Sequence, residues 1–252
     1  MSIGAHTMLT VALAVVSVVQ WGIASPVEAA DNKGMALVPA GKFSMGSDDL
    51  MESDPVHDVE LDSCYIDITE VTVAAYRAYA KAGSKVMPAA PQWGWSEDHP
   101  ISNVSWSEAK EYCDKAGKRL PTEAEWEKAA RGTDGRIFPW EKGKADGRVN
   151  QLGSEDGFGT TAPVGSYPGG QSPYGVFDMA GNVWEWCADW YDGKYYRKSP
   201  AKNPKGPEKG TARAYRGGAW NNTPYVLQSA GRGKDLPGKK DSSIGFRCAS
   251  GT

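Results

Sequence analysis

The sequence contains few residues of the kinds that hold redox metals or act as nucleophiles. Its 252 residues include four cysteines and three histidines, and no cysteine lies between Cys187 and Cys248. The cysteines are widely spaced, whereas zinc sites use paired short spacings, so a zinc-thiolate site is not expected. His6 lies in an N-terminal export-like segment, which leaves His57 and His99, too few for a three-histidine iron site.

The sequence also lacks a strong charge of either sign. It has 28 lysines and arginines against 31 aspartates and glutamates, which gives a formal net charge of −3, and the basic residues are dispersed. This pattern does not provide the positive surface of a DNA- or RNA-binding protein. We therefore expect no nucleic-acid partner.

Glycine, proline and tryptophan are abundant, with 30, 16 and 10 residues. This mixture is typical of a loop-rich fold whose irregular segments are fixed by large aromatic side chains. A hydrophobic content of 40% suits one sizeable core. Regular structure is expected to be sparse over 133–180, and bound cations would restrain this stretch, because long structureless loops are uncommon in compact domains.

Local signals predict three helices and several short strands before that stretch. Thr72 is a candidate N-cap, and capping boxes begin at Ser105 and Thr122, each with a glutamate three residues later. Glycines at 83, 117 and 132 supply the stops. The predicted helices are 73–82, 105–116 and 122–131. Apolar patterning predicts two short strands within 35–46, with a turn at 39–41, and a strand over 57–62.

The N-terminal segment resembles an export signal. An apolar run from Met8 to Val19 is followed by small residues at 27 and 29, which favours cleavage before Ala30. Residues 1–7 contain no lysine or arginine, so an uncleaved membrane anchor is the alternative. We expect residues 1–29 to be a signal peptide and residues 30–252 to form a single domain in the periplasm or outside the cell.

Seven runs of sequence together match one known family, although any one of them alone is a weak signal. They are Leu37-Val38-Pro39-Ala40-Gly41, His99-Pro100-Ile101-Ser102-Asn103-Val104-Ser105-Trp106, Gly117-Lys118-Arg119-Leu120-Pro121-Thr122-Glu123-Ala124-Glu125-Trp126-Glu127, Phe138-Pro139-Trp140, Gly181-Asn182-Val183-Trp184-Glu185-Trp186, Arg216-Gly217-Gly218-Ala219-Trp220 and Ile244-Gly245-Phe246-Arg247-Cys248. From about Met35 to Ala249 the chain resembles the formylglycine-generating enzyme, or sulfatase-modifying factor, family. The resemblance implies an irregular, loop-rich α+β fold related to C-type lectins, with low secondary-structure content.

The activity that defines this family is not expected here. The resemblance implies oxidation of a sulfatase cysteine to formylglycine by two copper-holding cysteines just after the Gly-Gly-aromatic strand. This chain has no cysteine or methionine between Cys187 and Cys248, and soft Cu(I) needs thiolate or thioether ligands. Relatives that make ergothioneine-type sulfoxides hold iron through histidines, largely from an additional helical domain. We predict neither copper nor iron and assign no catalytic residue. A Ser–His–Asp hydrolase using His57 or His99 is less favoured than structural roles for both.

The resemblance also implies two structural calcium sites. The matching positions of the first are the Asn150 side chain, the Gln151 carbonyl, the Asp156 carboxylate and the Phe158 carbonyl. Those of the second are the Asp178 side chain, the Gly181 and Val183 carbonyls and the Glu185 carboxylate. Calcium prefers oxygen ligands of these kinds. Without the resemblance, Asp156 and Asp178 would be interpreted as turn residues.

Four cysteines beyond an export signal indicate disulfides, and spacing alone leaves their pairing open. The resemblance implies a bridge between Cys113 and Cys248. Cys64 and Cys187 have no counterpart in the family; they form either a second bridge or two buried free thiols.

The substrate groove of the family would be lined here by Trp220, Asn221, Asn222 and Arg232. These side chains offer hydrogen bonds and charge but no nucleophile. Trp93 and Trp95 lie in a predicted surface loop, where paired aromatics could bind a sugar, although packing is the favoured interpretation.

These observations lead to three functional hypotheses. The first is an exported, calcium-stabilised protein without catalytic activity, a binding or assembly subunit that uses the former substrate cleft to recognise another exported protein. The second is a maturation enzyme of the oxidoreductase type with non-standard chemistry, similar to periplasmic relatives implicated in siderophore maturation. The third is a lectin-like carbohydrate-binding module, which fold analogy alone does not establish. Contact with a membrane is expected only through an uncleaved N-terminal segment.

Overall fold

The computed structural model of the protein describes Met1 and residues 32–252, except positions 142, 144 and 154. Residues 2–29 of the predicted signal peptide 1–29 lie outside the described residues. Among the residues described, no helix is long and apolar enough to cross a membrane. All elements described below belong to the unit Asn32–Thr252, one of two units into which the chain divides at Asp31.

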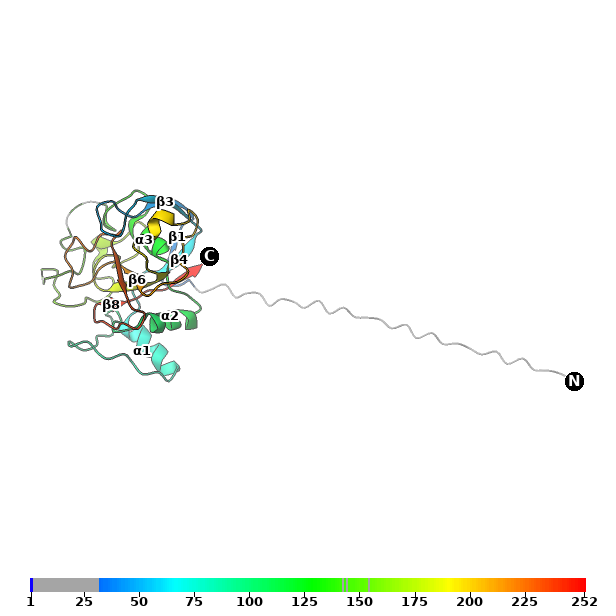
Figure 1. Cartoon of the computed structure of the whole chain (residues 1–252). Coiled ribbons are helices and arrows are strands. Elements are labelled where there is room, and N and C mark those ends of the chain that lie inside the picture. The colour runs from blue at the N-terminus through cyan, green and yellow to red at the C-terminus, as the bar shows by residue number, and fades with distance from the viewer. Residues whose placement is uncertain (2–31, 142, 144, 154) are drawn as a thin grey trace. The chain divides into compact units, whose positions relative to one another are not determined.

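Regular elements are few and short, and long connections separate them (Figure 1). The helices are α1 (Val73–Ala82), α2 (Trp106–Lys115) and α3 (Glu123–Arg131), with the 3₁₀ turns η1 (Pro168–Gly170) and η2 (Tyr195–Lys198). The strands are β1 (Met35–Val38), β2 (Gly41–Met45), β3 (His57–Leu61), β4 (Cys64–Asp67), β5 (Trp184–Trp190), β6 (Arg213–Arg216), β7 (Arg232–Asp235), β8 (Ile244–Gly245) and β9 (Ala249–Gly251).

All three helices begin where their capping residues predict. Thr72 accepts a hydrogen bond from the Ala75 N–H at the start of α1. Ser105 and Thr122 form complete capping boxes at the starts of α2 and α3, because each glutamate also accepts from the N-cap backbone. Local hydrogen-bonding chemistry therefore sets where each helix begins, and distant groups accept from other first-turn N–H groups, as Asp189 does from the Glu123 N–H at 3.0 Å.

The two strands predicted within 35–46 are both present, but they do not lie in one sheet. β1 pairs with β4, which pairs with β9 on its other edge, whereas β2 pairs only with β3. Lys128 explains the separation, since its ammonium donates to the carbonyls of Pro39 at 2.6 Å and Gly41 at 2.9 Å. This buried lysine of α3 holds the corner at which the chain passes from one sheet to the next.

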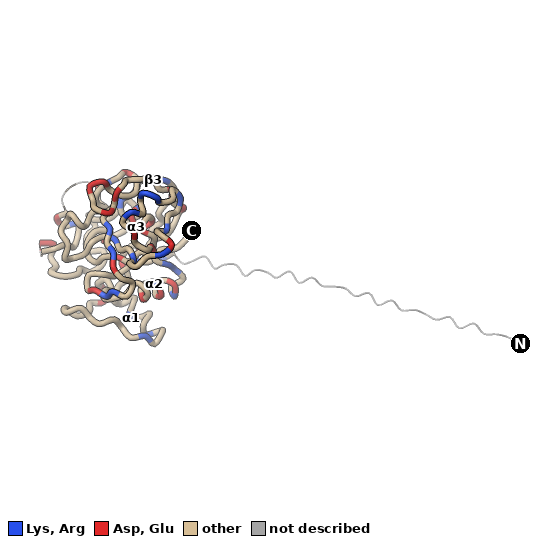
Figure 2. The backbone as a smooth tube through the Cα atoms, viewed as in Figure 1, with Lys and Arg blue, Asp and Glu red and all other residues tan. Residues whose placement is uncertain are grey.

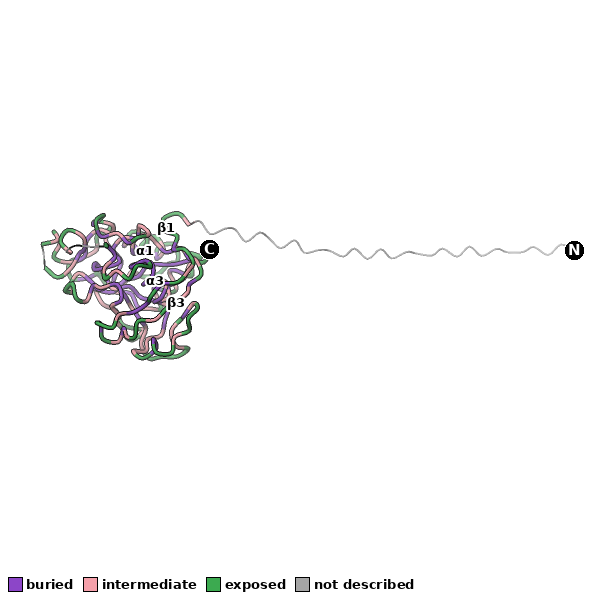
Figure 3. Tube along the Cα trace, turned by 90° about the horizontal axis from the view of Figure 1, so that it is seen from above, coloured by how far each residue is buried: buried purple, intermediate pink, exposed green. Residues whose placement is uncertain are grey.

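A third sheet has the strand order β7-β6-β5-β8. β5 is antiparallel to β6 and parallel to β8, and it is mostly buried. Trp126 and Trp186 have no exposed surface and anchor two apolar clusters on either side of this sheet. Figure 3 shows the buried residues gathered in the middle of this unit, with exposed residues along its connections.

The Cys113–Cys248 bridge implied by the resemblance is present, and it joins α2 to the segment before β9. The second bridge is not formed, because Cys64 and Cys187 are separate buried thiols. Cys64 lies on β4 and Cys187 on β5, and both pack within one apolar cluster as thiols, so the even cysteine count did not indicate a second bridge.

Candidate cation sites and binding cleft

The first predicted calcium site lies in the irregular stretch between α3 and β5. Asp156 organises it by accepting hydrogen bonds from the backbone N–H groups of Gln151 at 2.8 Å and Phe158 at 2.9 Å. Asn150 donates to Asp156 and to the Thr160 carbonyl. Asp156 therefore stabilises a turn, and these hydrogen bonds bring the four predicted residues together.

Buried acceptors without donors remain at this first site. Asn150 Oδ1 and Gln151 Oε1 are both buried and neither has a hydrogen-bond partner. Leaving such an atom unpaired costs about 1–3 kcal/mol. A hard cation that accepts amide and carboxylate oxygens would satisfy these atoms, so the residues present fit calcium.

The second predicted site is arranged differently from the expectation. Glu185 is fully buried, but Arg247 donates to both of its oxygens at 2.7 Å, and Trp126 Nε1 donates a third hydrogen bond at 2.7 Å. Asp178 accepts from the Gly165 N–H at 2.6 Å. Glu185 is thus already neutralised by an arginine, whereas Asp178 is not.

Glu70, which the sequence analysis missed, supplies the unpaired carboxylate of this region. Both of its oxygens are buried without a hydrogen-bond donor. Burial and the neighbouring charge of Asp178 raise the pKa of Glu70, and burial raises that of Asp178. A cation beside Glu70 and Asp178 would stabilise their ionised forms. The position of Glu70 just before α1, far from Asp178 in sequence, gave no local signal.

No group of three or more His, Cys, Asp or Glu side chains in the described part of the chain is arranged to hold a metal. Both candidate sites would therefore depend on amide and backbone oxygens in addition to one or two carboxylates. Such mixed ligand sets suit calcium rather than zinc or copper.

Three of the four predicted cleft residues lie at one surface turn. Trp220 packs edge to face against Trp93, with ring centroids 5.2 Å apart, and its Nε1 is buried without an acceptor. Asn221 is exposed, whereas Asn222 Oδ1 accepts from the Ala219 N–H at 3.0 Å and stabilises the turn. Trp93 is 37% exposed, so packing accounts for most of its surface, as favoured above.

The expectation that Arg232 offers a free charge in the cleft is wrong. Its side chain is 1% exposed and makes two hydrogen bonds to Glu123. A third hydrogen bond goes to the Glu52 carbonyl at 2.8 Å. Arg232 therefore holds the structure together behind the cleft, and its guanidinium is not available to a ligand.

A cavity of about 190 Å³ lies beside Trp184, and Arg232 forms part of its inner wall. Its other lining residues are Leu50, Met51, Ser53, Trp184, Tyr225, Val226 and Gly231. Trp220, Asn221 and Asn222 do not line it. This cavity is thus more apolar than the cleft expected from the sequence, and Met51 and Tyr225 at its rim are 88% and 62% exposed.

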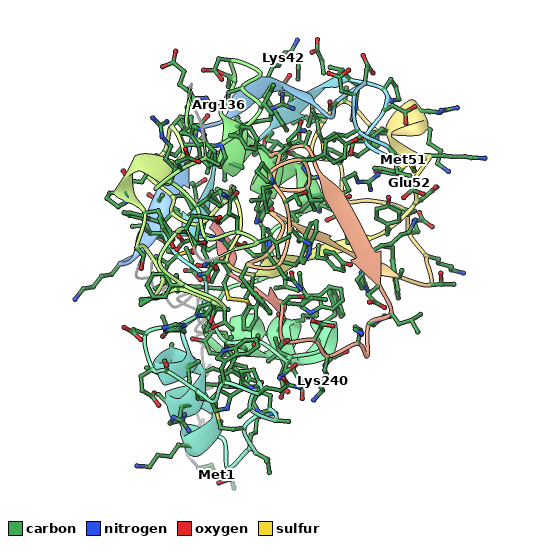
Figure 4. All side chains as sticks on the ribbon, turned by 90° about the vertical axis from the view of Figure 1, so that its left-hand side faces the viewer. Met1, Lys42, Met51, Glu52, Arg136 and Lys240 are labelled. Carbon is green, nitrogen blue, oxygen red and sulfur yellow. A yellow bond between two sulfur atoms is a disulfide. The ribbon has the colours of Figure 1, made fainter. Side chains whose placement is uncertain are left out.

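Glu52 fixes the loop that forms one wall of this cavity. Its carboxylate accepts hydrogen bonds from Tyr191 Oη at 2.7 Å and Lys234 Nζ at 2.8 Å, which lower its pKa. Its backbone has a φ of 61°, a conformation that a non-glycine residue adopts only when its surroundings impose it. Figure 4 shows Met51 and Glu52 together at the outer edge of the molecule.

The two histidines of the described residues have structural partners. His99 Nδ1 lies 2.9 Å from Thr161 Oγ1, and burial lowers the pKa of this histidine. His57 Nδ1 lies 3.0 Å from the carbonyl of Pro55. Neither arrangement is that of a Ser–His–Asp hydrolase.

The irregular α+β fold, with its few short elements, defines a class of protein related to formylglycine-generating enzymes. Residues 21–252 match the model of the sulfatase-modifying factor enzyme 1-like domain, and the chain belongs to this family.

The relatives similar to this chain include one named as an enzyme and one named as inactive. The formylglycine-generating enzyme of Streptomyces coelicolor is 35% identical, over 86% of this chain and 89% of the relative. The inactive C-alpha-formylglycine-generating enzyme 2 of Bos taurus is 30% identical, over 86% and 88%. The solved structure of PvdO from Pseudomonas aeruginosa has a TM-score of 0.78 and 31% identity, over 86% of this chain and 94% of that one.

Proposed function

We propose that this protein is an exported, calcium-stabilised binding or assembly subunit that does not generate formylglycine. The observation that carries the proposal is that the sequence has no cysteine between Cys187 and Cys248. An apolar cavity beside Trp184 supports a binding role. Cu(I) lacks the two soft ligands that the family activity requires. The bovine relative, which is named as inactive, supports the idea that the fold persists without that activity.

The cavity beside Trp184 would receive an apolar side chain of a partner protein. Exposed Met51 and Tyr225 form its rim, and flexible methionine and aromatic side chains are frequent in protein-binding surfaces. The charges of Arg232 and Glu52 are already paired, so the cavity offers shape rather than a reactive group.

A photo-crosslinker placed at position 225 in cells of the source organism tests this role. We expect one dominant crosslinked envelope protein. The same crosslinker at position 86 should give none, because Val86 is 93% exposed but does not line the cavity. With the purified partner, Met51→Ala and Tyr225→Ala should each weaken binding about tenfold, as interface anchors do. Equal binding by both variants and by Val86→Ala would exclude the cavity as the recognition site.

A maturation enzyme with non-standard chemistry is the second candidate, and similarity to the solved PvdO structure keeps it in consideration. Native mass spectrometry of the protein from its own envelope separates the two. Calcium as the only metal, together with a stable partner chain, supports a binding subunit. A redox metal or a modified small molecule on a monomer supports the enzyme.

A further inference from the structure

Although the basic residues are dispersed over most of the chain, one segment is rich in them. Residues 194–209 contain six basic residues and one acidic residue, Glu208. The basic residues are Lys194, Arg197, Lys198, Lys202, Lys205 and Lys209. The tube of Figure 2 shows Lys and Arg positions near β3, beside which this segment runs.

The segment 194–209 is held in a fixed course along β3. Tyr195 and Tyr196 are buried at its start. The Glu60 N–H donates to the Ala201 carbonyl at 2.7 Å, and the Asn203 N–H donates to the Glu60 carbonyl at 2.9 Å. Because the backbone is already ordered, its cations can meet a ligand with little loss of conformational entropy.

Several of these cations are available to a ligand. Arg197, Lys198 and Lys202 are 64%, 66% and 64% exposed, and their carboxylate partners are also at the surface, where such pairs contribute little. Lys205 has no ion pair with a carboxylate among the residues that the structure describes.

Lys205 stands where two cavities adjoin. One has a volume of about 500 Å³ and the other about 350 Å³. Both are lined by Arg119, Thr122, Glu125 and Lys205, so they form one groove between α2, α3 and the segment 194–209. This groove shares no lining residue with the cavity beside Trp184.

One end of the groove has a rigid aromatic surface. Trp106 lines it together with Leu120 and Ala188. The guanidinium of Arg213 lies 3.7 Å from the centre of the Trp106 ring system, and Trp106 Nε1 donates to the Cys187 carbonyl at 2.7 Å. The indole is therefore fixed from one face and from its polar edge, as a stacking platform requires.

The groove also contains carboxylates that are already partnered. Glu125 accepts two hydrogen bonds from Arg119, at 2.6 and 2.7 Å, and Asp62 accepts one from Asn203 at 2.7 Å. Each carboxylate oxygen can accept more than one hydrogen bond. Such oxygens suit a ligand with many hydroxyl groups.

We infer that this groove binds a linear, carboxylate-bearing oligosaccharide. Its carboxylates lie against Lys205, the cation of the segment 194–209 that lines both cavities. A sugar ring stacks on Trp106, and the hydroxyl groups donate to Asp62 and Glu125. Prolines at 200, 204 and 207 lack an N–H, so the segment cannot recognise a peptide by adding a strand. A membrane surface is too broad to enter the concave part of the groove.

Calorimetric titration of the full chain with oligogalacturonate of defined length tests this assignment. The matched ligand control is the fully methyl-esterified oligosaccharide, which keeps the sugar chain and has no charge. The protein variants are Lys205→Gln and, as a control, Lys81→Gln, since Lys81 is an exposed residue of α1 that lines neither cavity. A decamer of glutamate and anionic lipid vesicles are titrated in parallel.

We expect the charged oligosaccharide to bind with an affinity that falls as salt rises. The methyl ester and the Lys205→Gln variant should each bind about tenfold more weakly, as loss of a hydrogen bond to a charged group predicts, and Lys81→Gln should bind normally. Equal binding of the methyl ester, or equal effects of the two lysine variants, would overturn the assignment. Tighter binding of polyglutamate would assign the groove to an acidic polypeptide, and binding to vesicles alone would assign it to a membrane surface.

Discussion

Arg232 donates two hydrogen bonds to Glu123, from Nε to Oε1 at 3.0 Å and from Nη2 to Oε2 at 2.7 Å. The two side chains are 1% and 3% exposed, and they join β7 to the first turn of α3. Behind them, Arg216 and Arg131 pair with Glu127 of the same helix. A line of buried ion pairs thus connects α3 to strands β6 and β7.

Replacing Arg232 by methionine should destabilise the protein by about 3–5 kcal/mol, because Glu123 would be left as a buried charge without its main partner. Urea unfolding followed by fluorescence measures the change. The double variant Arg232→Met/Glu123→Gln should recover part of the loss. If Arg232→Met costs less than about 1 kcal/mol, the ion pair does not hold α3 in place.

Asp189 should make stability depend on pH in an unusual direction. Burial and then the charge of Glu123 raise its pKa well above the usual range, while Arg232 opposes the shift and Glu125 adds to it. In the folded protein Asp189 keeps its proton at pH values where the unfolded chain has lost it. Its contribution to the free energy of unfolding therefore falls as pH rises from about 4 through the folded pKa.

The variant Asp189→Asn removes this titration while retaining an oxygen for the Glu123 N–H. Its stability relative to the natural protein should increase with pH above about 4 and be unchanged below. Urea unfolding at a series of pH values measures the difference. A difference that stays constant with pH would show that Asp189 does not change its protonation on unfolding, and Asp62→Asn at the surface controls for the general effect of removing a charge.

Calcium should raise the melting temperature, and Asn150 should account for one of two ions. At a free concentration a hundred times the Kd, each ion would contribute about 2.7 kcal/mol. Asn150→Ala removes the unpaired Oδ1 and should reduce the stoichiometry in native mass spectrometry from two ions to one, with Asn221→Ala unchanged. A melting temperature that neither calcium nor a chelator changes would contradict a structural role for calcium.

Breaking the Cys113–Cys248 bridge by the double alanine variant should cost about 2–4 kcal/mol, because the bridge closes a long loop in the unfolded chain. Cys64 and Cys187 should react with a thiol reagent only after denaturation, since both are buried and burial raises the pKa of Cys64 to about 12. Two thiols appearing in denaturant identify these residues. Four thiols, or none, would contradict this disulfide assignment.

Local chemistry allowed the helices to be predicted almost to the residue, whereas pairings across the chain were not predictable. Ser105 and Thr122 each pair with a glutamate three residues later, so the sequence spacing alone predicts these capping interactions. The pairing of Arg232 with Glu123 and the position of Glu70 beside Asp178 arise only when distant segments pack. The resemblance predicted the Cys113–Cys248 bridge, but it could not reveal that Arg247 already neutralises Glu185.

The sheet β1-β4-β9 has its first and last strands on opposite edges of β4, with Ile66 paired to both Ala36 and Ala249. The sheet is therefore complete only when residues from both ends of the domain have met, and closing so long a loop slows folding. Until β9 docks, β4 has an open edge of unpaired backbone groups that could join another chain. Docking of β9 would thus protect β4 from pairing with another chain.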